Sequence, residues 1–312
     1  MTDSSSDSTR CPVCGSPGTA PAFAAEDLAL RSVPGRFSYR RCGACGSVYV
    51  APQPDERTLA AAYPSSYENY QTLPALVERL ASPLTLPEAR RFIRHADAGG
   101  RLIELGAGNG RFLERLRRCG WRGPLEGVEF DQAAAAATSA RTGFPVRCAD
   151  LNEEILPEQA YEAIVMRHVI EHLRRPAAIL EMVFAALRPG GLLFIGTPDA
   201  RALSAKVFGR HWWGYEVPRH LVVFSDPALR STVARAGFES VDRWSGFSPL
   251  MWSASLGLLL SDRQAPGWLR GVASSPANPL TMAAFGVASA LEVAVGRSTM
   301  LCLVARRPAA AR

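Results

Sequence analysis

The chain has 312 residues, of which 47% are hydrophobic, and a formal net charge of +6 at pH 7. This length suits one α/β domain with a full core and one small additional module. The charge comes from arginines spread along the chain, so it argues only weakly for a nucleic-acid partner. Residues 1–10 are mostly Ser, Thr and Asp, which predicts a disordered tail rather than a signal peptide or an anchor, and a cytoplasmic protein.

Two Cys-x-x-Cys-Gly motifs follow this tail. Four thiolates are the tetrahedral ligand set of a structural zinc ion, and the glycine after each motif permits a tight turn. Residues 11–50 are therefore predicted to form a zinc ribbon, with a hairpin or loop between residues 20 and 41 and a short strand at 48–50. With all ligands being cysteine, no coordination position remains for catalysis. The predicted zinc ligands are Cys11, Cys14, Cys42 and Cys45.

The remaining cysteines, Cys119, Cys148 and Cys302, lie in or beside apolar segments and are expected to be core thiols rather than disulfides. Residues 51–97 contain six prolines between short helical patterns at 75–80 and 88–95. This composition predicts a helical connector to the main domain.

Apolar segments alternate with helical patterns from residue 98 to residue 307. Helix signals include Asp131 before the run that ends at Gly143, Pro176 before the run that ends at Pro189, and Asp226 before the run that ends at Gly237. This alternation predicts a doubly wound, mostly parallel sheet of seven strands. The strands are expected at 101–105, 125–129, 145–148, 162–166, 191–196, 241–247 and 300–305.

Residues 102–110 read Leu-Ile-Glu-Leu-Gly-Ala-Gly-Asn-Gly, a strand that runs into a glycine loop. Glycines let a backbone approach a ligand closely, and Glu129 at the end of the next strand can accept from both hydroxyls of a ribose. A nucleoside cofactor is implied. A dinucleotide is disfavoured, because the third glycine comes one residue early for Gly-x-Gly-x-x-Gly and Glu104 would repel a diphosphate.

The order of strand, Glu104-x-Gly-x-Gly-x-Gly110, helix, strand ending in Glu129, and then Asp150 resembles the class I S-adenosylmethionine-dependent methyltransferases. The resemblance implies a Rossmann-like fold in which Glu104 and the glycine loop hold the methionine part of S-adenosylmethionine. It also implies that Glu129 holds the ribose, and Asp150 and Leu151 the adenine. The cofactor-binding residues implied in this way are Glu104, Gly106, Ala107, Gly108, Gly110, Glu129, Phe130, Asp150, Leu151 and His168.

Residues 166–173 and 187–198 are similar to the branch of this family that includes ubiquinone-pathway O-methyltransferases and sugar C-methyltransferases. His168 is expected at the end of a strand beside the donor methyl, where sites on this fold are built. Some relatives bind a divalent ion through Glu-x-x-Glu-His, but His168 replaces the first Glu of that pattern. A metal role, packing against cofactor or substrate, and helix capping therefore stay open for His168, Glu171 and His172.

Residues 211–225 combine two of the five histidines with four aromatic residues in a predicted loop. Such loops carry substrate contacts, and aromatic walls suit a flat or sugar-like acceptor. Pro-x-His-x-x-x-Phe-Ser at 218–225 is similar to an active-site segment of zinc-bearing sugar C-methyltransferases, which makes His220 a candidate base beside His168. Arg219 replaces the Glu of that segment and is a candidate for binding an anionic acceptor. A backbone hydrogen bond at the loop base is the alternative for His220, and the aromatic residues form either a lid or a plug.

Residues 248–297 form an apolar insertion in the methyltransferase domain predicted at 98–307. We expect this insertion to cover the acceptor pocket, to form a dimer face or to contact a membrane peripherally. Pro249, Gly257 and the serines disfavour a membrane span. The predicted enzyme methylates an oxygen or carbon of a small-molecule, sugar or glycan- or lipid-linked acceptor, with a histidine as base. The alternatives are an RNA methyltransferase that uses the ribbon, and a cofactor-binding scaffold without activity.

Overall fold

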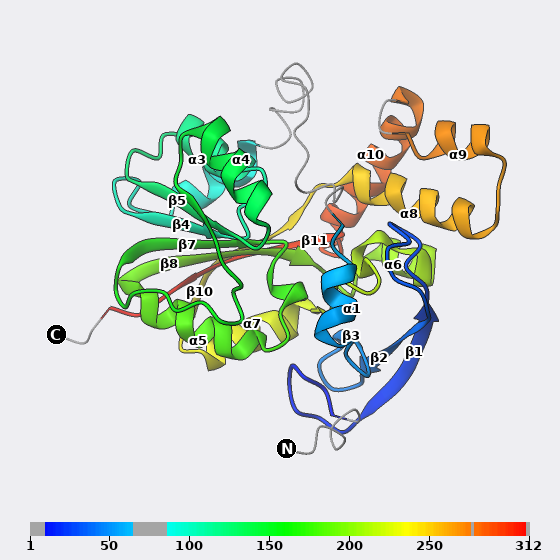
Figure 1. Ribbon diagram of the computed structural model, residues 1–312, viewed down its shortest axis with the longest axis horizontal. Coiled ribbons are helices and arrows are strands. Elements are labelled where there is room, and N and C mark those ends of the chain that lie inside the picture. The colour runs from blue at the N-terminus through cyan, green and yellow to red at the C-terminus, as the bar shows by residue number, and fades with distance from the viewer. Residues whose placement is uncertain (1–9, 65–85, 276–277, 310–312) are drawn as a thin grey trace. The chain divides into compact units, whose positions relative to one another are not determined.

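The computed structural model describes residues 10–64, 86–275 and 278–309 (Figure 1). The predicted helix at 75–80 lies outside the described residues. The chain divides into two compact units. Unit 1 comprises Met1–Pro64, Thr197–Thr232 and Trp244–Cys302, and unit 2 comprises Ser65–Gly196, Val233–Arg243 and Leu303–Arg312.

A seven-stranded sheet forms the centre of unit 2, and each strand coincides with one predicted from the sequence. Five neighbouring strands pair in parallel, in the order β6-β5-β4-β7-β8. Gly190 and Gly191 exchange backbone hydrogen bonds with Arg307, which pairs β11 against β8 in the antiparallel sense. The strands are β4 (Leu102–Leu105), β5 (Leu125–Glu129), β6 (Val146–Cys148), β7 (Tyr161–Arg167), β8 (Leu187–Pro198), β10 (Glu239–Gly246) and β11 (Met300–Arg306).

Helices cover both faces of this sheet: α3 (Arg111–Arg118) and α4 (Gln132–Thr142) lie on one side in Figure 1, and α5 (Pro176–Ala186) on the other. A further helix occupies residues 86–93, and α7 (Asp226–Arg235) begins at the predicted Asp226. Asp131 caps α4 by accepting a hydrogen bond from Ala134 N at 2.7 Å, as the sequence predicts.

The helix α5 ends at Ala186, before the predicted end at Pro189. The reason is that β8 already begins at Leu187, which pairs with Tyr161 of β7. Pairing along the sheet therefore overrides the local helix pattern at this junction.

Unit 1 contains a second, four-stranded sheet whose strands are all antiparallel to their neighbours. Three strands are the predicted ribbon hairpin and the short strand after it: β1 (Thr19–Ala25), β2 (Phe37–Cys42) and β3 (Val48–Val50). The fourth, β9 (Val222–Val223), comes from the segment predicted as the acceptor loop. The α-helices that lie wholly within the described part of unit 1 are α1 (Glu56–Ala61), α6 (Leu203–Phe208), α8 (Pro249–Asp262), α9 (Gly267–Ala273) and α10 (Pro279–Ala294).

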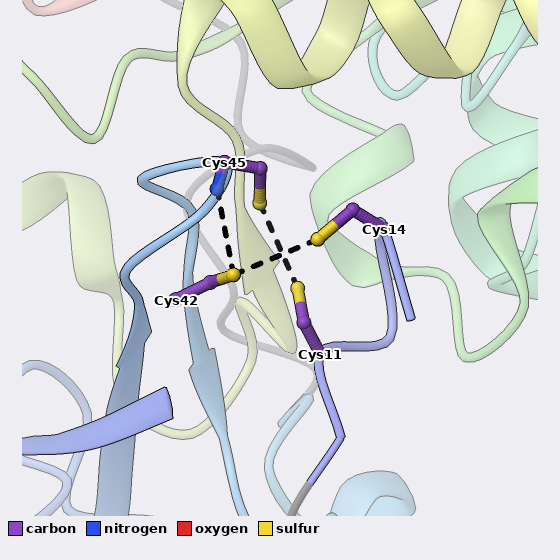
Figure 2. A group of neighbouring side chains, drawn as sticks. All are labelled: Cys11, Cys14, Cys42 and Cys45. Carbon is purple, nitrogen blue, oxygen red and sulfur yellow. Dashed lines mark hydrogen bonds between the residues drawn. The ribbon is translucent and has the colours of Figure 1, made fainter. Parts of the chain in front are cut away.

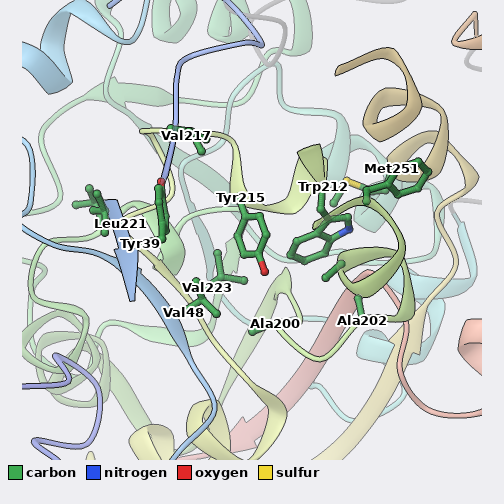
Figure 3. Packing of buried hydrophobic residues seen from close by; sticks show 14 residues of the cluster. Tyr39, Val48, Ala200, Ala202, Trp212, Tyr215, Val217, Leu221, Val223 and Met251 are labelled. Carbon is green, nitrogen blue, oxygen red and sulfur yellow. The ribbon is translucent and has the colours of Figure 1, made fainter. Parts of the chain in front are cut away.

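An aromatic core fills unit 1 (Figure 3). The ring of Phe23 stacks on Tyr39 with centroids 4.8 Å apart, and Tyr215 packs edge-on against Trp212 at 5.0 Å. Both Trp212 and Tyr215 are buried. Of the two roles considered for the aromatic residues, these two therefore form the hydrophobic plug and not the lid. Within the described parts of the chain, every helix is too short or too polar to cross a membrane.

Candidate active site and cysteine centre

The glycine loop joins β4 to α3 in unit 2. Backbone amides of Gly106 and Ala107 both donate to Val128 O, at 2.8 and 2.9 Å. Gly106, Gly108 and Gly110 have φ angles of +71°, +52° and +70°, which favour glycine. A Cβ on Gly106 would lie 2.4 Å from Cγ2 of Val169, so this position also needs glycine for space. These hydrogen bonds hold the loop against β5. Because the glycines have no Cβ atoms, a ligand can approach the backbone of the loop closely.

Glu129 ends β5 beside this loop, and its side chain is buried. Its Oε2 accepts a hydrogen bond from Gly108 N at 2.7 Å, and its Oε1 accepts from Phe130 N at 2.8 Å. Burial raises the pKa of Glu129, while these backbone donors act against the rise. The carboxylate is thereby held in one position at the edge of the glycine loop.

Glu104 on β4 is a buried carboxyl group whose Oε2 accepts no hydrogen bond from any described residue. Burial raises its pKa to about 8, and the positive charges of Arg167 and Arg115 oppose the rise. An unsatisfied buried carboxyl group is costly unless a ligand satisfies it. A cationic amino group of a ligand fits this requirement.

Arg167, at the end of β7, was not among the residues that the sequence pattern singled out. Its guanidinium pairs with Glu88 at 2.9 Å and lies 4.5 Å above the ring of Phe112. Because its positive charge also opposes the rise in the pKa of Glu104, it belongs to the surroundings of the site. An arginine at a strand end carries no motif that would have identified this role.

His168 follows β7 and adopts a φ of +54°, which is uncommon for a residue other than glycine. Its backbone N–H donates to Gly196 O at 2.8 Å, and its ring is 40% exposed with Nδ1 3.6 Å from Glu171 Oε1. The next residue, Val169, packs on Gly106. Since β4 and β7 are neighbours at which the strand order reverses, His168 borders the glycine loop at the topological switch point.

The three residues predicted at the adenine end follow β5 and β6. Phe130 is exposed, and Leu151 and Asp150 are half-buried. Oδ1 of Asp150 accepts hydrogen bonds from the backbone and side-chain nitrogens of Asn152, at 2.8 and 2.9 Å. The structure thus brings all predicted cofactor-binding residues to the carboxyl ends of four adjacent strands, β6, β5, β4 and β7.

His220 belongs to unit 1, whereas His168 belongs to unit 2. It is buried, with Nδ1 2.7 Å from Gly214 O and Nε2 3.3 Å from Glu216 Oε2. The backbone hydrogen bond considered for this residue is therefore present. For Nε2 to accept a proton from a substrate, its contact with Glu216 has to be replaced by a contact with that substrate.

Arg219 does not serve as an exposed anion-binding group, so that prediction is wrong. Its guanidinium is fully buried and pairs with Asp27, with Nη2 to Oδ2 at 2.9 Å and Nη1 to Oδ1 at 3.1 Å. Its Nε donates to Ala62 O at 2.7 Å. This ion pair lowers the pKa of Asp27, although burial of the carboxyl group acts in the opposite direction. Arg219 is a structural residue of unit 1.

The four predicted zinc ligands point toward one another in Figure 2. Their sulfur atoms all lie within 4.8 Å of one another, with Cys11 to Cys45 at 3.7 Å and Cys14 to Cys42 at 3.6 Å. A tetrahedral site with Zn–S bonds of about 2.3 Å has sulfur atoms about 3.8 Å apart. A hydrogen bond between the thiols lowers the pKa of Cys45 to about 4 and raises that of Cys11. The donor set and its spacing fit a structural zinc ion.

A family model described as a methyltransferase domain matches residues 71–242, more than half of the chain. A probable S-adenosylmethionine-dependent methyltransferase from Mycolicibacterium smegmatis is 29% identical over 156 residues, covering 48% of this chain and 56% of that protein. A ubiquinone biosynthesis O-methyltransferase from Cereibacter sphaeroides is 26% identical over 172 residues, covering 51% and 68%. The chain thus spans a little over half the length of the first of these curated relatives.

Solved structures of methyltransferases share the fold. One is a putative sarcosine dimethylglycine methyltransferase from Galdieria sulphuraria, with a TM-score of 0.51, 14% identity, and coverage of 76% of this chain and 92% of that one. Another is a complex between the Trm112 methyltransferase activator and a putative methyltransferase from Haloferax volcanii, with a TM-score of 0.52, 14% identity, and coverage of 75% and 95%. At these identities the likeness concerns the fold alone.

Proposed function

Because the chain belongs to the methyltransferase-domain family, we propose that it transfers a methyl group from S-adenosylmethionine to an oxygen or carbon of a small-molecule, sugar or glycan- or lipid-linked acceptor. The observation that carries this proposal is the pair of buried carboxyl groups, Glu104 and Glu129, on either side of a glycine loop at the switch point of the sheet. The similarity to an O-methyltransferase of ubiquinone biosynthesis supports a small acceptor rather than RNA.

Different residues of unit 2 would bind different parts of S-adenosylmethionine. Glu104 would pair with the ammonium group of the methionine part, which satisfies its otherwise unpartnered oxygen. Glu129 would hold the ribose hydroxyls, with Asp150, Leu151 and Phe130 at the adenine end. When bound, S-adenosylmethionine supplies an electrophilic methyl group on a sulfonium ion.

Methyl transfer from a sulfonium is an in-line displacement, so the protein has to hold the acceptor about 3 Å from the methyl group and remove one proton. His168 is better placed as the base than His220, because its ring is 40% exposed beside the glycine loop and Glu171 lies 3.6 Å from its Nδ1. His220 is the weaker candidate, because its Nδ1 already contacts Gly214 O and its Nε2 already contacts Glu216.

Transfer of labelled methyl from S-adenosylmethionine to a metabolite pool, measured beside total RNA, tests this function. We expect label in the metabolite fraction, and a fall in turnover of about a hundredfold or more for His168→Ala, the usual cost of a lost general base. His95→Gln is the matched control, because His95 pairs with Asp242 on another part of unit 2. Label in RNA alone would replace this proposal with a ribbon-directed RNA methyltransferase. Cofactor binding without any S-adenosylhomocysteine formation would indicate a scaffold.

We also propose that Cys11, Cys14, Cys42 and Cys45 hold a structural zinc ion. Metal analysis of the purified chain should find one zinc per molecule, and Cys42→Ser should lose most of it. Cys148→Ser is the control, because Cys148 is an exposed cysteine outside the cluster. Full zinc content in Cys42→Ser would contradict the assignment.

A further inference from the structure

The helix α10 in unit 1 is inverted relative to an ordinary surface helix. Its buried positions include two polar residues, Ser289 and Glu292. Large apolar side chains instead face solvent in a stripe at successive spacings of seven and four residues along the helix, continued four residues further by Val295. These residues, 58% to 81% exposed, are Leu280, Val287, Leu291 and Val295.

Hydrogen bonds hold α10 in this orientation. Glu292 is fully buried, and its carboxylate accepts from Trp252 Nε1 of α8 at 2.9 Å and from Ser204 N at 2.7 Å. Ser289 Oγ accepts from Ser248 N at 2.9 Å. Rotating the helix to bury its apolar stripe would break these bonds and leave Trp252 Nε1 and the backbone N–H groups of Ser204 and Ser248 without these acceptors, which is costly. The stripe therefore stays outward.

The exposed charged residues of the same segment are all basic. Residues 247–297 contain two acidic residues, of which Glu292 is buried and Asp262 pairs with Arg210 at 2.8 Å and His211 at 2.7 Å. The basic residues of the segment, Arg263, Arg270 and Arg297, are all exposed. Trp268 on α9 is also largely exposed. An apolar face, an exposed tryptophan and cationic surroundings are the combination with which helices lie on an anionic bilayer.

We propose that α8, α9 and α10 form a membrane-binding face that lies on the surface of anionic lipid bilayers, with the stripe of α10 in the interface. The charge of the segment selects a bilayer over a second copy of the chain, because two such cationic faces would repel each other. The proposal goes beyond methyl transfer and does not depend on it.

Flotation of the full chain with lipid vesicles, without cofactor or acceptor, tests the face. We expect binding to vesicles of mixed phosphatidylglycerol and phosphatidylcholine to be at least about tenfold tighter than to pure phosphatidylcholine. The double substitution Val287→Glu with Leu291→Glu should weaken it by about tenfold or more, because it places charge in the interface. Replacing Arg263, Arg270 and Arg297 by Gln should abolish the preference for phosphatidylglycerol.

Ile155→Glu is the matched control, because Ile155 is 85% exposed and lies in unit 2. It should bind vesicles as the unmodified chain does. Trp268→Ser provides a second variant if the double substitution unfolds α10, which circular dichroism would show. The proposal fails if the chain floats with neither kind of vesicle, or if Ile155→Glu weakens binding as much as the double substitution. It also fails if the face forms a dimer instead of binding vesicles. In that case the unmodified chain would not bind vesicles, and sedimentation would give the double substitution half the mass of the unmodified chain.

Discussion

Binding of S-adenosylmethionine should release a proton from Glu104. Burial raises the pKa of this carboxyl group to about 8, so roughly nine-tenths of it is protonated at pH 7. A ligand ammonium placed against Oε2 favours the ionised form. If its pKa falls to about 5 in the complex, about 0.9 proton leaves per site at pH 7, and cofactor affinity rises with increasing pH by up to tenfold per unit between these two pKa values.

The same group sets a pH dependence of folding stability. Its folded-state pKa lies above the unfolded value of 4.5, so between pH 4.5 and pH 8 the folded state binds a proton that the unfolded state does not. Stability therefore falls as pH rises through this window, and the loss is complete above pH 8. At 1.36 kcal/mol per unit, the loss amounts to about 5 kcal/mol as an upper estimate.

Calorimetry in buffers of different ionisation enthalpy measures the proton release, and urea unfolding at pH 5 and pH 9 measures the stability. Glu104→Gln should bind the cofactor with no linked proton from this site and should gain stability relative to the unmodified chain at pH 9 but little at pH 5. Release of the same number of protons by Glu104→Gln, or no release by the unmodified chain, would refute the reasoning.

Three further substitutions test the site and its support. Glu129→Ala should weaken S-adenosylmethionine binding by about tenfold or more in equilibrium dialysis, because a hydrogen bond to a charged group contributes about 1.5 to 3 kcal/mol; a change within twofold would contradict the ribose assignment. Gly106→Ala should destabilise unit 2 by about 1 to 3 kcal/mol in urea unfolding, because its Cβ would lie 2.4 Å from Val169, and Val169→Ala should recover the steric part. Arg219→Met should cost about 3 to 5 kcal/mol by leaving Asp27 buried without its partner, and adding Asp27→Asn should recover part of that loss.

Local patterns predicted the central sheet well, because each strand is an apolar run bounded by helix signals. The cap at Asp131 and the left-handed turn at Gly143 depend only on neighbours in sequence, so they were visible there. The strand β9 was not visible, since Val222 and Val223 form a strand only by pairing with β3. Arg219 was misread for a similar reason. Its partner Asp27 is 192 positions away, and its burial cannot be read from the segment around it.

The role of the cysteine ribbon follows from such long-range contacts within unit 1. Tyr39 of β2 donates a hydrogen bond to His220 O at 3.2 Å, and Ser225 Oγ donates to Cys45 O. Together with the pairing of β3 and β9, these bonds attach the ribbon to the segment that carries His220. The ribbon thereby supports the segment of unit 1 that carries His220. This structural role explains the presence of the ribbon without a nucleic-acid partner. Loss of the metal ligands should therefore disturb the surroundings of His220 as well as the ribbon itself.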